Sequence, residues 1–271
     1  MKISVVIVLS GDCIDRYTNA MKQFEVLDRQ TRKPDEIIYV EQSVDKIFYY
    51  DKLPIKVDGE YVRYIPIIYN KYPQLFNVCW CRNVGINNSI GDIVINLDVD
   101  YVFDNQYIES IANYDVKTHL IGWDTIYYIF NDQRVKFMRD NIFPVGIENI
   151  DGDKTIYKRY LKGNGGIQIF NKEWLLNNLG GYCEDLFFWG GDDTDIYRRA
   201  GRVDSGEKRL DYDVFHINHK KFYGERLLNK VVLDRNSVDI QKTNELLKSV
   251  GLGKMTEPSP IYPDTIKWAL R

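Results

Sequence analysis

The segment from residue 82 to residue 100 most constrains the fold, because an apolar run within it ends in two carboxylates. The run from Ile93 to Leu97 is too continuous for a strand with one face in water, so it predicts a central strand buried on both faces. Asp98 and Asp100 close the run, and ligands of open α/β sheets bind at such carboxyl ends. Paired acids there suit a divalent cation with a diphosphate, although a solvated turn after the strand is an alternative interpretation.

The first 110 residues alternate between strand and helix patterns. Apolar runs at 3–9, 36–40, 61–68 and 93–98 predict strands, with helical spacing between the first two and around 75–89. This order predicts an α/β fold with a Rossmann-like, doubly wound sheet. Gly11 stands alone after the first strand, so the glycine-rich fingerprint of nicotinamide and flavin domains is absent.

The pattern loosens after residue 110. We expect a helix over 105–114, a strand or hairpin over 119–130, a polar loop over 143–154 and a strand over 167–170 that leads into a helix capped by Asn171. The sequence therefore predicts a ligand-binding half over 1–110, a second half over 111–224 and a helical appendage over 225–271.

Composition narrows the class of protein. The chain has 271 residues, a formal net charge of −3 and a pI near 5.7, which give no general attraction to nucleic acid or to anionic membranes. The apolar run at 3–9 is far shorter than the roughly 20 residues of a membrane span, so we expect no membrane span and no signal peptide. Four cysteines without metal spacing predict reduced thiols and a cytoplasmic location.

A second informative stretch runs from Trp189 to Arg199. Gly190 and Gly191 directly precede Asp192 and Asp193, and a helix begins there. Together with Asp195 they put three acids in the first helical turn, where the helix dipole favours negative charge, so structure alone could account for them.

His216 and His219 follow the next apolar segment and are two of only three histidines in the chain. Their spacing suggests metal ligands, and the alternative is a pair of hydrogen-bonded histidines at a strand end.

Together these pieces resemble nucleotide-sugar glycosyltransferases of the A-type fold, most closely the β-1,4-galactosyltransferase family and related bacterial inverting transferases. The resemblance covers roughly residues 1–220. Arg82-Asn83-x-Gly85 with Asp98-Val99-Asp100 is similar to the donor motif of the family, and Gly165-Gly166 through Trp174 to its strand and helix before the acceptor loop. The most specific match is Trp189-Gly-Gly-Asp-Asp-Thr-Asp.

The resemblance implies roles for individual residues. Asp192 and Asp193 would hold the acceptor, with Asp193 as the catalytic base, and Trp189 with its two glycines would close over the donor. Asp100, His216 and His219 would bind Mn²⁺, with Mg²⁺ as the second choice, and Asp98 would lie near the ribose or the ion.

The chain also departs from the family. The family has a proline after the first strand and an acid pair after the second, and this chain has Leu9-Ser10-Gly11 and Glu41-Gln42-Ser43 there. Without those family residues, the candidates for uracil recognition are Glu41 and Arg82.

The resemblance implies Mn²⁺-dependent transfer of a hexose or N-acetylhexosamine from a UDP-sugar to a glycan or glycoconjugate hydroxyl, with inversion. Gly163-Asn164 in place of bulky aromatics favours an N-acetylhexosamine. Two other classes remain: a haloacid-dehalogenase-like sugar phosphatase, because Asp98 to Val102 fits its Asp-x-Asp-x-Val element, and a non-catalytic glycan-binding module.

Overall fold

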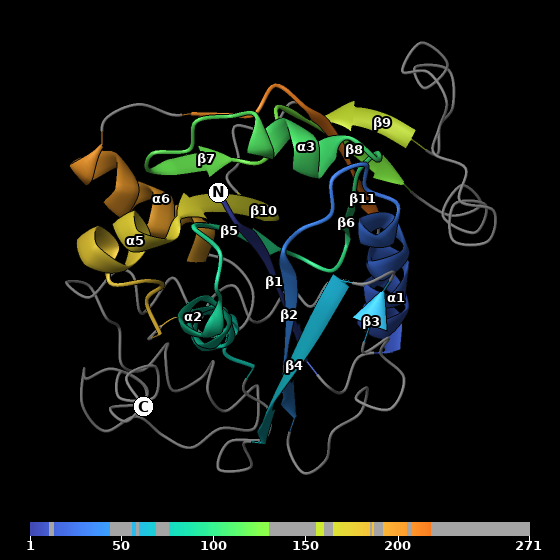
Figure 1. Ribbon diagram of the computed structural model, residues 1–271, viewed down its shortest axis with the longest axis horizontal. Coiled ribbons are helices and arrows are strands. Elements are labelled where there is room, and N and C mark those ends of the chain that lie inside the picture. The colour runs from blue at the N-terminus through green and yellow to red at the C-terminus, as the bar shows by residue number, and fades with distance from the viewer. Residues whose placement is uncertain are drawn as a thin grey trace, which may run out of the picture.

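The computed structural model describes residues 1–10, 14–43, 56–57, 60–68, 76–129, 156–159, 165–184, 186, 192–204 and 208–217. Its centre is a mixed seven-stranded sheet in the order β3-β4-β2-β1-β5-β10-β7 (Figure 1). The strands, in chain order, are β1 Ile3–Ser10, β2 Glu36–Ser43, β3 Lys56–Val57, β4 Glu60–Ile68, β5 Ile93–Leu97, β7 His119–Ile121 and β10 Ile167–Asn171.

Four of these strands run parallel, as the predicted doubly wound sheet requires. β1 lies between β2 and β5, and β4 lies beside β2. The side chains of β5 are all buried, which explains its continuous apolar sequence. β10 then adds to β5 in the antiparallel direction and β7 to β10, so strands from both predicted halves of the chain complete one sheet.

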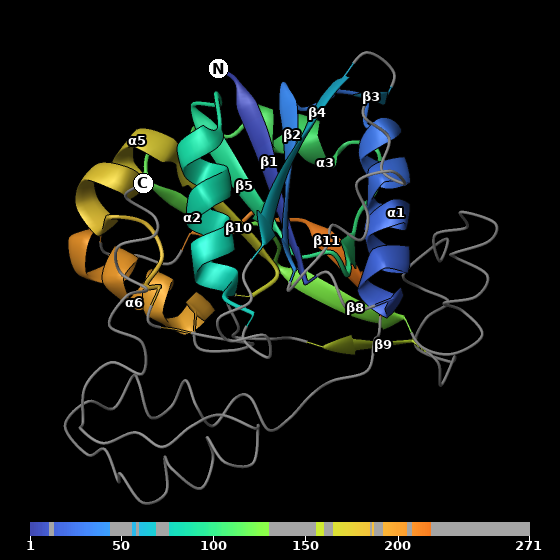
Figure 2. The ribbon, with the colours of Figure 1, turned by 90° about the horizontal axis from the view of Figure 1, so that it is seen from below.

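Helices cover both faces of the sheet. α1 Ile14–Asp28 and α2 Val78–Asn88 lie on opposite sides of it (Figure 2). α2 packs closely because residue 85 is glycine: a Cβ atom there would come within 2.3 Å of Val6 Cγ1. Asn77 caps α2 by accepting a hydrogen bond from the Trp80 backbone N–H. The other α-helices are α3 Tyr107–Ala112, α5 Lys172–Trp174 and α6 Asp192–Val203.

A second, four-stranded sheet lies beside the first, in the order β6-β11-β8-β9. Its strands are β6 Tyr101–Val102, β8 Thr125–Ile129, β9 Ile156–Arg159 and β11 Asp213–Ile217. β6 begins directly after Asp100 and pairs with β11, so this small sheet holds the end of the Asp-x-Asp segment against residues more than 100 positions later.

One local prediction is wrong. The segment 119–130 is not one strand or a hairpin, because β7 joins the large sheet and β8 the small one. The predicted helix after Asn171 is confirmed, with Asn171 as its cap: it is α-helical over Lys172–Trp174, continues as a π-helix, η3 Leu175–Leu179, and ends at Gly180 with a φ of 67°. The loop at 143–154 and the appendage at 225–271 lie outside the described residues.

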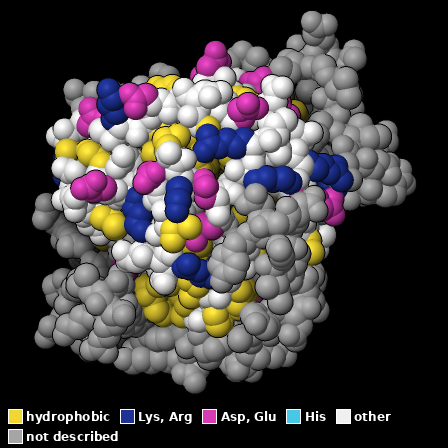
Figure 3. Space-filling model, in the orientation of Figure 1, with side chains coloured by type: hydrophobic (Ala, Val, Ile, Leu, Met, Phe, Trp, Pro, Cys, Tyr) yellow, Lys and Arg dark blue, Asp and Glu magenta, His cyan; other side chains and the backbone are white. Residues whose placement is uncertain are grey.

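Among the described residues, no helix is long and apolar enough to span a membrane. Acidic and basic side chains are interspersed over the described part of the face in Figure 3. This mixture agrees with the small net charge of −3.

Candidate functional site

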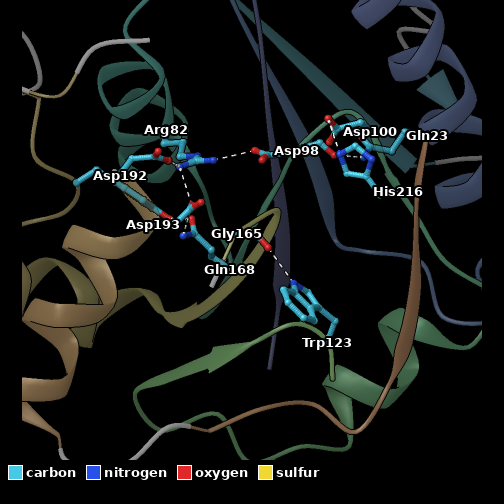
Figure 4. Close-up of polar contacts among 11 residues, drawn as sticks. Gln23, Arg82, Asp98, Asp100, Trp123, Gly165, Gln168, Asp192, Asp193 and His216 are labelled. Carbon is cyan, nitrogen blue, oxygen red and sulfur yellow. Dashed lines mark hydrogen bonds and ion pairs between the residues drawn. The ribbon is translucent and has the colours of Figure 1, made fainter. Parts of the chain in front are cut away.

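Arg82 lies at the centre of a cluster of carboxylates that come from two separate parts of the chain. It projects from α2, is 3% exposed, and donates from Nη2 to Asp98 Oδ1 at 2.7 Å (Figure 4). Its Nη1 pairs with Asp192 Oδ2 and lies 3.9 Å from Asp193 Oδ1. Burial lowers the pKa of the Arg82 guanidinium, but Asp192 and Asp98 outweigh this effect and hold the pKa above its usual range. The cluster therefore contains a permanent positive charge.

Asp98 and Asp100 lie where the sequence predicts them, directly after the carboxyl end of β5. The Asp98 backbone N–H donates to the Gly166 carbonyl at 2.8 Å, and Gln23 Nε2 on α1 donates to the Asp98 carbonyl at 2.6 Å. Burial and the neighbouring Asp100 raise the pKa of the Asp98 carboxyl, and Arg82 opposes them. Asp98 has no basic neighbour in sequence, and the fold supplies Arg82 as its partner in space.

Asp100 and His216 form a buried pair beside the arginine cluster. His216 Nε2 lies 3.3 Å from Asp100 Oδ2, and the Tyr101 ring meets the imidazole edge to face at 5.1 Å between centroids. The β6–β11 pairing and a 2.7 Å hydrogen bond from the Ile217 N–H to the Asp100 carbonyl fix both backbones. Two of the three predicted metal ligands are thus adjacent.

A carboxylate and an imidazole are a donor set that fits Mn²⁺. The third predicted ligand, His219, lies outside the described residues. Within the described part of the chain, no group of three or more His, Cys, Asp or Glu side chains is arranged to hold a metal ion. The metal-binding role of the Asp100–His216 pair therefore stays a prediction.

Asp192 and Asp193 begin α6 and lie on the other side of Arg82 from Asp98 (Figure 4). Asp193 Oδ1 accepts a hydrogen bond from Gln168 Nε2 on β10 at 2.8 Å. Burial and then Asp192 raise the pKa of the Asp193 carboxyl, whereas Arg82 lowers it. A carboxyl group with a raised pKa is a stronger base once it is ionised.

Gly165 and Gly166 permit the close approach of three chain segments. Gly166 has a φ of 88°, and a Cβ atom there would come within 2.0 Å of the Tyr101 ring. A Cβ atom at Gly165 would come within 2.6 Å of Asp193 Oδ2. Trp123 Nε1 donates to the Gly165 carbonyl at 2.8 Å and holds the turn in place (Figure 4).

The other predicted donor-binding residues have different outcomes. Glu41 is buried at the carboxyl end of β2, where its carboxylate accepts hydrogen bonds from the hydroxyls of Ser43 and Tyr64. Trp189 and the two glycines after it lie outside the described residues. Their contribution to donor binding stays a prediction.

Sequence reasoning missed Gln168, Trp123 and Gln23, which contact the backbone or side chains of the predicted site residues. A signal existed for Gln168, because it is the single polar residue within the apolar run 167–170. The positions of Trp123 and Gln23 have no comparable pattern.

The chain is similar to known proteins in one segment of its sequence and in its fold. The family model described as the N-terminal domain of galactosyltransferase matches residues 151–221. A crystal structure of GalNAc-T7 with UDP, GalNAc and Mn²⁺ is similar at 17% identity and a TM-score of 0.59, covering 94% of this chain and 55% of that one. A crystal structure of S. aureus TarS 1–349 in complex with UDP-GlcNAc is similar at 13% identity and a TM-score of 0.53, covering 92% and 65%.

No curated protein sequence matches the chain. The chain spans about half to two thirds of the length of the two similar structures. Together the family model and the structures confirm the predicted glycosyltransferase A-type fold and the predicted resemblance to nucleotide-sugar glycosyltransferases.

Proposed function

We propose that this protein transfers an N-acetylhexosamine or hexose from a UDP-sugar to a sugar hydroxyl, with Mn²⁺ bound and with inversion at the anomeric carbon. One observation carries the proposal. The carboxylate of Asp193 faces the carboxyl end of β5, where Asp98 separates Arg82 from the Asp100–His216 pair (Figure 4). The proposed base and two of the proposed metal ligands thus lie at the sheet edge where α/β folds bind ligands.

Asp100 and His216 would hold the metal ion, with His219 as the proposed third ligand. The bound ion would supply positive charge to the departing diphosphate. Because the pair is buried and fixed by β6 and β11, it needs little rearrangement to accept the ion. Asp98 is proposed to bind near the ribose through Oδ2, since its Oδ1 accepts the hydrogen bond from Arg82.

Asp193 would act as the general base. The acceptor hydroxyl would lose its proton to Asp193 while its oxygen bonds to the anomeric carbon and the bond to the diphosphate breaks. Its raised pKa supports this role, because a more basic carboxylate takes a proton more readily. Asp192, held by Arg82, would bind the acceptor beside it.

The donor is proposed to be a UDP-N-acetylhexosamine. GalNAc-T7 was crystallised with UDP and GalNAc, and TarS with UDP-GlcNAc, so both similar proteins bind an N-acetylhexosamine or its nucleotide. The small Gly163-Asn164 pair in the sequence is consistent with room for an N-acetyl group. The cytoplasmic location and the contributions of Glu41 and Arg82 to uracil binding stay predictions.

A panel of UDP-sugars with Mn²⁺ tests the proposal, with released UDP measured in the presence and absence of simple sugar acceptors. We expect acceptor-stimulated release of UDP with UDP-GlcNAc or UDP-GalNAc, and none with EDTA. A preference for UDP-galactose or UDP-glucose would contradict the donor assignment. Release of phosphate from sugar phosphates would favour the phosphatase, and glycan binding without turnover would favour the binding module.

A further inference from the structure

The two oxygens of the Asp193 carboxylate have different surroundings. Oδ1 accepts the 2.8 Å hydrogen bond from Gln168 Nε2 and lies 3.9 Å from Arg82 Nη1. Oδ2 lies against Gly165, whose missing side chain leaves room beside that oxygen. One oxygen is therefore held by the protein, and the other faces the glycine turn.

The Gln168 amide is held by a hydrogen bond at each end. The Tyr182 hydroxyl donates to Gln168 Oε1, and the amide NH₂ group donates to Asp193. With Asp193 ionised, a flipped amide would place its oxygen against the carboxylate, and two acceptors would repel each other. Burial raises the pKa of the Tyr182 phenol, so this donor keeps its proton at neutral pH.

Tyr182 is itself anchored on α2. Its backbone N–H donates to Asn83 Oδ1 at 2.8 Å, and Asn83 Nδ2 donates to its carbonyl at 2.9 Å. The centroid of its ring lies 5.1 Å from the guanidinium carbon of Arg82, the residue next to Asn83 in α2. Gln168 is fully buried in β10 and Tyr182 is buried beside it, so neither side chain can turn freely.

We propose that Gln168, oriented by Tyr182, is a positioning residue that fixes the Asp193 carboxylate so that Oδ2 takes the proton of the acceptor hydroxyl. This inference rests on the proposed function. The hydroxyl proton passes to Oδ2, the acceptor oxygen forms its bond to the anomeric carbon, and the electron pair of the breaking bond leaves with the diphosphate.

The hydrogen bond from Gln168 also favours the charged form of Asp193. The other charged or titratable groups around Asp193 are Arg82 from α2, Asp98 after β5, Asp192 on α6 and the Tyr182 phenol. Removing the Gln168 amide leaves these four groups in place. The acid limb of the pH profile therefore isolates the contribution of the amide.

The experiment compares the pH dependence of kcat/KM for the wild type, Gln168→Leu and Tyr182→Phe, with UDP affinity measured by calorimetry. In Gln168→Leu the acid limb should move to higher pH by about one pH unit, because the ionised carboxylate loses a hydrogen bond. Tyr182→Phe should move it in the same direction by less, because the Gln168 amide keeps its hydrogen bond to Asp193 but loses the hydroxyl that holds its other end. UDP affinity should be unchanged in both.

Gln30→Leu is the matched control. Gln30 is also a buried glutamine, and its amide donates to the Val26 and Asp104 carbonyls away from the site. It should lose stability and keep the wild-type acid limb. An unchanged acid limb in both Gln168→Leu and Tyr182→Phe would overturn the proposal, and Tyr182→Phe decides alone if Gln168→Leu does not fold.

A second measurement separates this proposal from the proposed function. The carboxyl carbon of Asp193 is titrated by NMR in ¹³C-aspartate-labelled protein without substrate, with Asp193→Asn providing the assignment. If the titration of Asp193 moves to higher pH in Gln168→Leu, the role of Gln168 is supported, whether or not any UDP-sugar is turned over. If no UDP-sugar is turned over, only the proposed transfer function is contradicted. An unchanged titration overturns the role of Gln168 whatever the activity.

Discussion

Asp193 lies in the first turn of α6 and is proposed to be the catalytic base, and a single substitution tests which of these two features matters for turnover. Asp193→Asn keeps the shape of the side chain, so we expect it to fold, to bind UDP with Mn²⁺, and to lose about 10² to 10⁴ of kcat. Steady-state kinetics with the preferred UDP-sugar measure this loss. A variant that keeps more than about a tenth of the wild-type kcat would move the base elsewhere, with Asp192 first.

Asp195→Asn is the control for Asp193→Asn, because Asp195 lies in the same first turn of α6 and pairs with Arg199 at 2.8 Å. It should cost about 0.5 to 1 kcal/mol of stability and leave kcat nearly unchanged.

The Asp100–His216 pair makes a separate prediction about the metal ion. Asp100→Asn and His216→Ala should each weaken Mn²⁺-dependent UDP binding by at least about tenfold, because each removes one proposed ligand. Isothermal calorimetry with and without Mn²⁺ measures the loss, and Asp115→Asn, at an exposed carboxylate that pairs with Lys117, is the control. If both variants bind UDP and Mn²⁺ as tightly as the wild type does, the metal lies elsewhere.

The contact between α2 and β1 determines where Arg82 lies, and two glycines provide a matched test of it. Gly85→Ala places a Cβ atom 2.3 Å from Val6 Cγ1, so we expect a loss of about 1 to 3 kcal/mol in the free energy of unfolding. A Cβ atom added by Gly201→Ala in α6 would meet no atom within 4 Å, so this change should stabilise the protein by about 0.5 to 1 kcal/mol. Chemical denaturation measures both, and equal effects would contradict the packing argument.

The elements of the first half could be predicted from sequence because their signals are local. β1, β2, β4 and β5 are apolar runs whose period and length identify them without reference to their partners. The segment 119–130 could not be predicted, because its two strands belong to different sheets. β7 pairs with β10 in the large sheet, and β8 pairs with β11 in the small one, about 90 residues later in the chain. Periodicity carries no information on such distant pairings.

The site was predictable to a similar extent. Carboxylates after a buried strand and after two glycines are visible in sequence, and so is a histidine at a strand end. The pairing of Arg82 with Asp98 and Asp192 is not visible, since Asp192 is 110 positions away and only the fold brings it near. The same is true of Gln168, whose role depends on Tyr182 and on α6.

At the scale of the whole molecule, Arg82 joins the two halves of the chain. It binds Asp98 from the first half and Asp192 from the second, and all three side chains lie around the end of the central sheet. Burial raises the pKa of both the Asp98 and the Asp193 carboxyl. A carboxyl whose folded-state pKa is raised stabilises the fold at low pH, and this contribution is lost as the pH rises through the folded-state pKa.

Arg82→Gln should therefore destabilise the protein in a pH-dependent way. Without the guanidinium, Asp98, Asp192 and Asp193 remain together with no neutralising charge. Breaking a buried ion pair such as Arg82–Asp192 costs about 3 to 5 kcal/mol at neutral pH. The loss should shrink as the pH falls toward 5, because the carboxyls protonate more readily when the positive charge is absent. Urea denaturation at pH 5 and at pH 8 measures it, with Lys117→Gln at an exposed pair as the control. A loss that is equal at the two pH values, or larger at pH 5, would mean that Arg82 stabilises the fold through packing and not by neutralising the carboxylates of both halves.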